Sequence, residues 1–175
     1  MSADKLDKIV VIGAGTMGQG IARTIAETGT EVILCDLNSE ILEKSLHLLS
    51  DALDRDIEKW GITASEKKAI LARIKANSDC CECVKHAKMV IEAIPESREN
   101  KRELFRKLDG VCPPETIFVS NTSTLSISDL ASATNRPEKV IGMHFLNPVH
   151  KVPLVETNLI GINHGRAFCI SGPRV

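Results

Sequence analysis

A glycine-rich turn between an apolar strand and a helix constrains the fold of this chain more than any other feature. The apolar run from Ile9 to Ile12 predicts a buried strand, which breaks at Gly13 and leads into a helix. Gly13, Gly15 and Gly18 follow the G-x-G-x-x-G spacing of dinucleotide-binding turns. We expect Gly13 to form a tight turn, Gly15 to let a pyrophosphate approach the backbone, and Gly18 to let the helix pack closely on the strand.

A second strand ends in the acid that a dinucleotide site requires. The segment from Glu31 to Cys35 leads into Asp36, about twenty residues beyond the turn. A carboxylate there accepts hydrogen bonds from both ribose hydroxyls and repels a 2′-phosphate, so NAD is favoured over NADP. Glycine-rich turns also occur for packing alone, but the order of strand, turn, helix, strand and acid favours NAD binding. The cofactor-binding residues expected in this unit are Gly13, Ala14, Gly15, Thr16, Met17, Gly18 and Asp36.

Strands and helices alternate through the rest of the chain. We expect strands near 88–94, 116–120, 140–144 and 152–156, separated by helices or turns. This alternation predicts a doubly wound, Rossmann-like α/β fold with a mostly parallel sheet. Residues 1–160 are expected to form one NAD-binding domain, and residues 161–175 a short divergent tail.

A helical hairpin is predicted at about 39–76, where a minimal doubly wound fold has one crossover helix. Gly61 ends its first helix. The apolar stripe of that helix is Leu42, Leu46, Leu49, Leu53, Ile57 and Trp60. The capping-box spacing of Thr63 and Glu66 predicts a second helix that runs to about Lys75. The hairpin either covers the core or forms a substrate-binding arm that carries Lys59.

Composition and charge exclude several classes of partner. The chain has 175 residues and a net charge of −1 without a basic block, so we expect no nucleic-acid partner. No apolar run reaches the roughly 18 residues of a membrane span. The first residues resemble neither a signal peptide nor a transit peptide. We therefore expect a cytoplasmic protein without a membrane partner.

The six cysteines raise the question of a metal site. Cys80, Cys81 and Cys83 lie close to His86, a combination that can bind zinc. No second pair of ligands follows at finger-like spacing, and a structural zinc ion needs four converging ligands. We therefore expect a loop with reduced thiols before the next strand, and no metal.

A histidine and a glutamate are candidates for proton transfer. His144 and Glu156 end two short strands joined by an Asn-Pro-containing connection, so their side chains can meet across a hairpin. A carboxylate on one imidazole nitrogen leaves the other free to take a proton from an alcohol as hydride leaves its carbon. Ser123, on a loop at the same sheet edge, could hydrogen-bond the same oxygen. The alternatives are a core histidine and a helix-capping serine.

Four blocks of the sequence closely resemble the 3-hydroxyacyl-CoA dehydrogenase family: Gly13–Ala22, Glu92–Glu96, Ser120–Ile127 and Gly142–Val149. The resemblance covers about residues 7–156. It implies an NAD-dependent oxidoreductase that interconverts 3-hydroxyacyl-CoA and 3-ketoacyl-CoA. Short-chain substrates such as 3-hydroxybutyryl-CoA are implied, in fatty acid or butanoate metabolism.

The same resemblance implies roles for individual residues. His144 matches the catalytic base, Glu156 its orienting partner, and Ser123 a residue that contacts substrate beside the nicotinamide. Lys59 matches a lysine that contacts CoA, although Ala52 stands where the family has a serine. The positions that match NAD contacts are Asp36, Glu96, Lys101, Ser123 and Asn147.

The resemblance ends before residues 162–175. In the family a C-terminal helical domain follows, which completes the acyl cleft and carries most of the contact between subunits of homo-oligomers. We expect this sequence to lack that domain and its usual dimer surface. An alternative function is therefore an NAD(H)-binding module with little or no turnover. A purely structural role is a further alternative, against which the presence of His144, Glu156 and Ser123 together argues.

Overall fold

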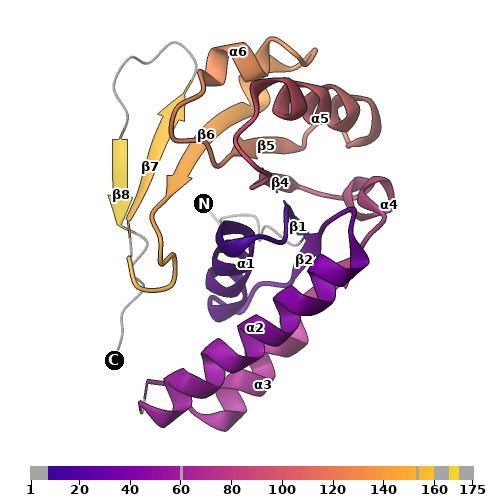
Figure 1. The fold of residues 1–175 in the computed structure, drawn as a ribbon. Helices are drawn as coiled ribbons and strands as arrows, with labels where there is room; N and C mark the ends of the chain where they lie inside the picture. The colour runs from indigo at the N-terminus through magenta and orange to yellow at the C-terminus, as the bar shows by residue number, and fades with distance from the viewer. Residues whose placement is uncertain (1–7, 60, 153, 160–165, 170–175) are drawn as a thin grey trace, which may run out of the picture.

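The computed structural model describes residues 8–59, 61–152, 154–159 and 166–169. Its strands are β1 (Ile9–Ile12), β2 (Val32–Cys35), β3 (Ile74–Asn77), β4 (Met89–Glu92), β5 (Ile117–Ser120), β6 (Val140–Phe145), β7 (Leu154–Leu159) and β8 (Arg166–Cys169). Its helices are α1 (Thr16–Glu27), α2 (Ser39–Glu58), α3 (Ala64–Arg73), α4 (Cys80–Val84), α5 (Arg98–Val111) and α6 (Ile127–Ala131), with a 3₁₀ helix at Pro137–Lys139. The strands form an eight-stranded sheet with helices on both faces (Figure 1).

The order of the strands determines where a ligand can bind. The sheet runs β3-β2-β1-β4-β5-β6-β7-β8. Strands β1 to β6 are parallel to their neighbours, whereas β7 and β8 continue the sheet antiparallel. The direction in which the sheet grows reverses between β1 and β4, and such a reversal opens a crevice at the carboxyl ends of the strands. The predicted doubly wound, mostly parallel fold is confirmed.

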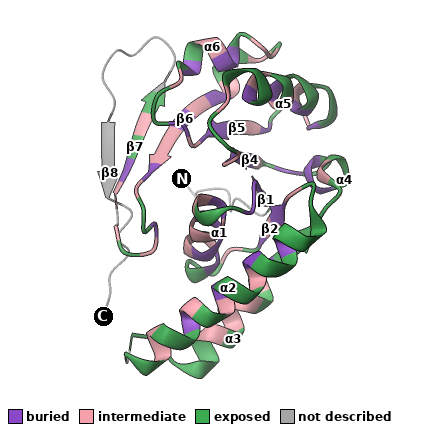
Figure 2. Ribbon diagram, viewed as in Figure 1, coloured by how far each residue is buried: buried purple, intermediate pink, exposed green. Residues whose placement is uncertain are grey.

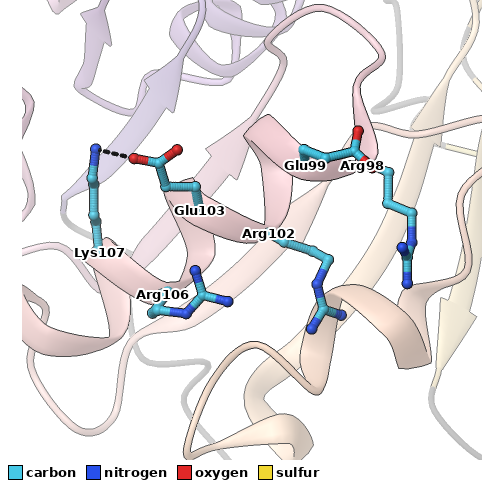
Figure 3. A pocket seen from close by; sticks show the side chains of 6 residues that line it. All are labelled: Arg98, Glu99, Arg102, Glu103, Arg106 and Lys107. Carbon is cyan, nitrogen blue, oxygen red and sulfur yellow. Dashed lines mark ion pairs between the residues drawn. The ribbon is translucent and has the colours of Figure 1, made fainter.

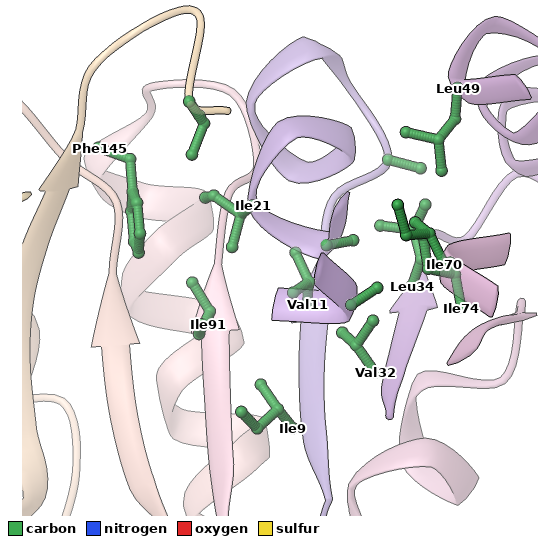
Figure 4. Packing of buried hydrophobic residues seen from close by; sticks show 14 of the residues in the cluster. Ile9, Val11, Ile21, Val32, Leu34, Leu49, Ile70, Ile74, Ile91 and Phe145 are labelled. Carbon is green, nitrogen blue, oxygen red and sulfur yellow. The ribbon is translucent and has the colours of Figure 1, made fainter. Parts of the chain in front are cut away.

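Successive residues of the central strands enter cores on opposite faces of the sheet. Ile9 and Val11 of β1 enter the cluster of Figure 4, where they meet residues of the first three helices, including Ile21, Leu49 and Ile70. Val10 and Ile12 enter the second cluster with residues of the last three helices, including Val84, Phe105 and Leu130. Figure 2 shows the buried residues along the strands and exposed residues on the outer sides of α2 and α5. Because both faces are covered, β1 is apolar at every position.

The predicted helical hairpin is present as α2 and α3, but it ends earlier than expected. Thr63 and Glu66 form the capping box at the start of α3. The second helix was expected to reach about Lys75, whereas Ile74 already begins β3 and pairs with Val32 of β2. Burial of Ile74 against the sheet outweighs the helical preference of its neighbours. This tertiary contact adds a parallel edge strand that the sequence pattern did not predict.

A buried arginine forms an ion pair that links the hairpin to α1. Arg23 of α1 donates to Asp56 of α2 at 2.6 Å and to Glu27 at 2.7 Å, and its side chain is only 5% exposed. Burial alone would raise the pKa of Asp56, but the hydrogen bond and charge of Arg23 and the charges of His150 and Lys151 lower it. The carboxylate of Asp56 therefore stays ionised and links α2 to α1.

The segment with three cysteines differs from the expected loop with reduced thiols. It forms the short helix α4, which begins where the side chain of Asp79 accepts the Glu82 N–H. Cys80 forms a disulfide with Cys35 at the end of β2, and the Cα atoms are 6.0 Å apart. The fold brings the start of α4 against the end of β2, a proximity that cysteine spacing in the sequence does not reveal. Cys81, Cys83 and Cys112 are free thiols.

The far edge of the sheet extends beyond the expected domain boundary at residue 160. Residues 166–169 were expected to belong to a divergent tail, yet they form β8, in which Ala167 pairs with Glu156 of β7. Residues 160–165 and 170–175 of that expected tail lie outside the described residues. Across the described ranges, no helix is both long and apolar enough to cross a membrane.

We predict that Asp56 contributes more to the free energy of unfolding than Asp54, two residues earlier on α2. Asp56→Ala leaves the buried Arg23 with Glu27 alone, and we expect a loss of about 3 kcal/mol. Asp54 pairs with Lys67 at 2.6 Å but is 54% exposed, so Asp54→Ala should cost less than about 1 kcal/mol. Urea denaturation measures the loss in free energy of unfolding for both variants. Each substitution replaces an aspartate of α2 with alanine, so the change in helix propensity is the same. Equal losses would contradict the anchoring role of Asp56.

Candidate functional site

The glycine turn lies where β1 meets the start of α1, against the loop after β4. Gly13 has a positive φ of 105°, and a Cβ there would lie 2.6 Å from the Ala93 carbonyl oxygen. A Cβ at Gly18 would lie 1.7 Å from the Gly13 carbonyl oxygen. A Cβ at Gly15, in contrast, would meet no atom within 4 Å. The tight turn expected at Gly13 and the close helix packing expected at Gly18 are confirmed, and the turn is open at Gly15.

The start of α1 can bind an anion. Gly15 is the N-cap and provides no side-chain hydrogen bond, so the first amides of the helix keep their N–H groups for a ligand. Asp36 lies beside this turn at the end of β2. Its Oδ2 accepts the Ala14 N–H at 2.9 Å, and its Oδ1 accepts the Asn38 N–H at 3.2 Å. The open turn and the adjacent carboxylate fit the diphosphate and a ribose of a dinucleotide.

A cleft of about 310 Å³ opens at the carboxyl edge of the sheet. The predicted site residues that line it are Met17, Glu96, Ser123, His144 and Asn147. The remaining lining residues are Ala93, Ile94, Asn121, Phe145 and Leu146. The cleft therefore brings together residues from the first turn of α1, from the end of β6 and from the loops after β4, β5 and β6.

His144 and Glu156 meet across the β6–β7 hairpin, as their positions in the sequence predict. They are directly opposite in the antiparallel register, and His144 Nδ1 lies 3.2 Å from Glu156 Oε2. The side chain of His144 is 28% exposed and that of Glu156 is 53% exposed. Because Glu156 contacts Nδ1 and the histidine lines the cleft, Nε2 is the nitrogen available to a ligand.

The loop after β5 presents Ser123, and Asn121 ties this loop to β6. The Asn121 side-chain oxygen accepts the Phe145 N–H at 3.0 Å. The Asn121 N–H donates to the Glu92 carbonyl oxygen at 2.9 Å. Asn121 has no predicted role, although it lies inside one of the four blocks that resemble the family. Ser123 is exposed at the cleft, two residues beyond this link.

Glu96 and Lys101, two predicted cofactor contacts, form an ion pair in the wall of the cleft. Lys101 Nζ lies 2.8 Å from Glu96 and 3.0 Å from Glu92, and the lysine side chain is 0% exposed. Burial alone would raise the pKa of Glu96, but hydrogen bonds from Lys101, Thr122 and Thr124 and the lysine charge lower it to about 2. Glu96 therefore presents a fixed negative charge at the cleft, whereas Lys101 lies behind it.

The connection between β6 and β7 rests on α1. It contains a cis peptide bond between Asn147 and Pro148. Val149 is buried against Gly20, where a Cβ would lie 2.9 Å from Val149 Cγ2. The hairpin that carries His144 is therefore docked on the same helix that begins at the glycine turn.

Lys59 lies apart from the cleft. It follows α2 as the C-cap residue, is exposed, and is absent from the lining of the cleft. The prediction that it contacts CoA stays a prediction. Within the described ranges, no group of three or more His, Cys, Asp or Glu side chains is placed to hold a metal ion.

A larger hollow of about 560 Å³ lies on the exposed side of α5 and contains none of the predicted site residues (Figure 3). Its lining is entirely charged. Arg98 and Arg102 pair with Asp129 of α6, and Lys107 pairs with Glu103. The two pairs with Asp129 join α5 to α6, whereas the Lys107–Glu103 pair lies within α5. The hollow is a charged helix surface, so the candidate site is the smaller cleft.

Comparison with known proteins agrees with this geometry. Residues 8–160 match the family model described as "3-hydroxyacyl-CoA dehydrogenase, NAD binding domain". The chain is 48% identical over 152 residues to the "Probable 3-hydroxybutyryl-CoA dehydrogenase" of Bacillus subtilis, covering 87% of this chain and 53% of the relative. It is 41% identical to the 3-hydroxybutyryl-CoA dehydrogenase of Clostridioides difficile, covering 85% and 53%.

Solved structures give the same result. The (S)-3-hydroxybutyryl-CoA dehydrogenase of Ralstonia eutropha superposes with a TM-score of 0.84 at 37% identity, covering 87% of this chain and 54% of that chain. The chain thus spans about half the length of the curated relatives and of this structure.

We predict that two Gly→Ala changes in the turn separate binding from folding. Gly15→Ala adds a methyl group into open space where we expect the diphosphate. It should weaken NADH binding at least about tenfold and change the free energy of unfolding by no more than about 1 kcal/mol. Gly18→Ala forces an overlap with backbone and should cost about 3 kcal/mol or more. NADH fluorescence titration and urea denaturation measure the two effects. Unchanged NADH affinity in Gly15→Ala would refute this assignment of the turn.

Proposed function

Because this chain belongs to the 3-hydroxyacyl-CoA dehydrogenase family, we propose that it binds NAD and supplies the proton-transferring residues for interconversion of 3-hydroxyacyl-CoA and 3-ketoacyl-CoA. The observation that carries the proposal is the His144–Glu156 contact of 3.2 Å at a cleft that also includes the first turn of α1. This contact supports the proposal because the proposed base and the proposed cofactor turn lie at one sheet edge.

The residues of the cleft perform separate tasks in this mechanism. NAD, when bound, accepts a hydride from the substrate carbon. His144 takes the hydroxyl proton through Nε2, and Glu156 stabilises the resulting imidazolium through Nδ1. In the reverse direction His144 returns the proton to the ketone oxygen. Ser123 can hydrogen-bond the same oxygen and so orient the reacting carbon.

The cofactor contacts follow the open turn and the adjacent acid. We propose that the amides around Gly15 bind the diphosphate and that Asp36 binds the ribose hydroxyls. Ala14, Thr16 and Met17 belong to the same turn. Glu96, Ser123 and Asn147 line the cleft and are proposed to contact the nicotinamide end.

We propose an acyl-CoA as the substrate. Lys59 is exposed at the end of α2 and is proposed to bind CoA phosphates as part of a substrate arm. A short acyl chain is supported by relatives named for 3-hydroxybutyryl-CoA. We further propose a cytoplasmic site of action.

A second candidate function is NAD(H) binding with little turnover. It is favoured by the 53% exposure of the Glu156 side chain. Water that reaches the dyad weakens the attraction between imidazolium and carboxylate.

The preference for NAD over NADP is predicted to depend on Asp36. Asp36→Ala should weaken NADH binding by about 1–3 kcal/mol because the ribose hydroxyls lose a charged acceptor. Asp36→Asn keeps an oxygen for the Ala14 N–H but removes the charge, so it should narrow the difference between NADH and NADPH. Fluorescence titration with both nucleotides measures these effects. Equal affinity of the unsubstituted chain for both would contradict the role of Asp36.

The two candidate functions differ in the turnover of acetoacetyl-CoA. The enzyme proposal expects NADH oxidation on adding acetoacetyl-CoA, and His144→Ala should slow it by about 10²- to 10⁴-fold without changing NADH affinity. His86→Ala, an exposed histidine at the end of α4, is the matched control and should leave the rate unchanged. NADH binding without acetoacetyl-CoA reduction would favour the binding module. No NADH binding at all would overturn both.

A further inference from the structure

A buried carboxylate behind the cleft is not used by the mechanism above. Glu92 is the last residue of β4, and its side chain is 0% exposed. Its carboxylate receives the Ile94 N–H at 2.8 Å and the Ser120 hydroxyl at 2.6 Å, and Lys101 Nζ lies 3.0 Å away. A buried charge is tolerated only when paired and hydrogen-bonded, as it is here.

Each of these three partners of Glu92 belongs to a different part of the cleft wall. Ile94 lies in the loop after β4 and lines the cleft. Ser120 is the last residue of β5, directly before the loop that carries Ser123. Lys101 comes from α5 and continues to Glu96 at 2.8 Å. One carboxylate therefore joins two strands and a helix directly behind the proposed nicotinamide end.

The network continues through Glu96 into the Ser123 loop. Glu96 accepts hydrogen bonds from the hydroxyls of Thr122 and Thr124, the residues on either side of Ser123. Thr122 in turn accepts the Leu125 N–H at 3.0 Å. The position of the Ser123 backbone thus depends on Glu96, whose carboxylate forms an ion pair with the buried Lys101.

We propose, on the basis of the function proposed above, that Glu92 is a positioning residue for the cofactor cleft. It acts through Lys101 on Glu96, and through Ile94 and Ser120 on the two loops that line the cleft. Without the Glu92 charge, Lys101 has only Glu96 as a carboxylate partner, and its buried ammonium draws that carboxylate away from the Ser123 loop. Glu92 touches neither NAD nor substrate in this scheme.

The first test uses the protein without any nucleotide. In Glu92→Gln, hydrogen exchange of the segments 93–97 and 121–125 should accelerate at least about fivefold, because the anchor of the Ile94 amide and of Ser120 is weakened. Thr116→Val is the matched control at the opposite end of β5. Thr116 is also 0% exposed, and its hydroxyl donates to the Ala87 carbonyl oxygen at 2.6 Å. The Thr116→Val variant should leave hydrogen exchange of both segments unchanged.

The second test measures NADH affinity by fluorescence. Glu92→Gln and Ser120→Ala should each raise the Kd for NADH about tenfold, whereas Thr116→Val should change it less than about twofold at a comparable loss of stability. If Glu92 acts through Glu96, Glu92→Gln should add little to Kd in a Glu96→Gln background. Additive effects would mean that Glu92 acts independently of Glu96 and would refute that route.

The outcomes separate this inference from the proposed function. Unchanged exchange and unchanged Kd in folded Glu92→Gln overturn the positioning role while NADH binding by the unsubstituted chain still stands. Accelerated exchange without any NADH binding by the unsubstituted chain overturns the proposed function, and with it the assignment of Glu92 to a cofactor cleft. If Glu92→Gln does not fold, the Kd for NADH of Ser120→Ala is compared with that of Thr116→Val. Equal Kd values for these two variants refute the proposal.

Discussion

The contact between the glycine turn and its two neighbouring strands is the constraint on which the structure depends. The Gly13 N–H donates to the Cys35 carbonyl oxygen at 2.8 Å. On its other side, Gly13 leaves no room for a Cβ against Ala93. The turn therefore lies in close contact with the end of β2 and with the residue that follows β4. Asp36 follows the first of these strands and Glu96 the second, so one turn sets the location of both acids relative to the start of α1.

The change of strand direction after β6 brings together His144 and Glu156, the proposed proton-transferring pair. A parallel neighbour would have placed the end of the next strand at the same sheet edge only after a long crossover. The antiparallel return of β7 instead puts Glu156 directly opposite His144. Their contact uses the short lateral distance between paired strands. A carboxylate and an imidazole thus meet by virtue of register alone.

Much of this arrangement could be predicted from the sequence because it depends on local patterns. The turn at Gly13 follows from glycine spacing, and the meeting of His144 with Glu156 follows from two strands with a short connection. Strand β3 could not be predicted, since the burial of Ile74 against Val32 is a long-range contact that overrides helical preference. The disulfide between Cys35 and Cys80 likewise depends on where α4 is placed by the sheet.

The contact between Val149 and Gly20 affects how precisely the parts of the site are positioned. The connection after β6 contacts Gly20, four residues into α1, and the glycine turn lies at the start of the same helix. At about 1.5 Å per residue, the two features are about 6 Å apart along the axis. A helix is stiff over that length, whereas loops are not. The spacing between the glycine turn and the segment that follows His144 is thus set by about one turn of a rigid helix, so the proposed cofactor turn and the proposed base share one fixed support.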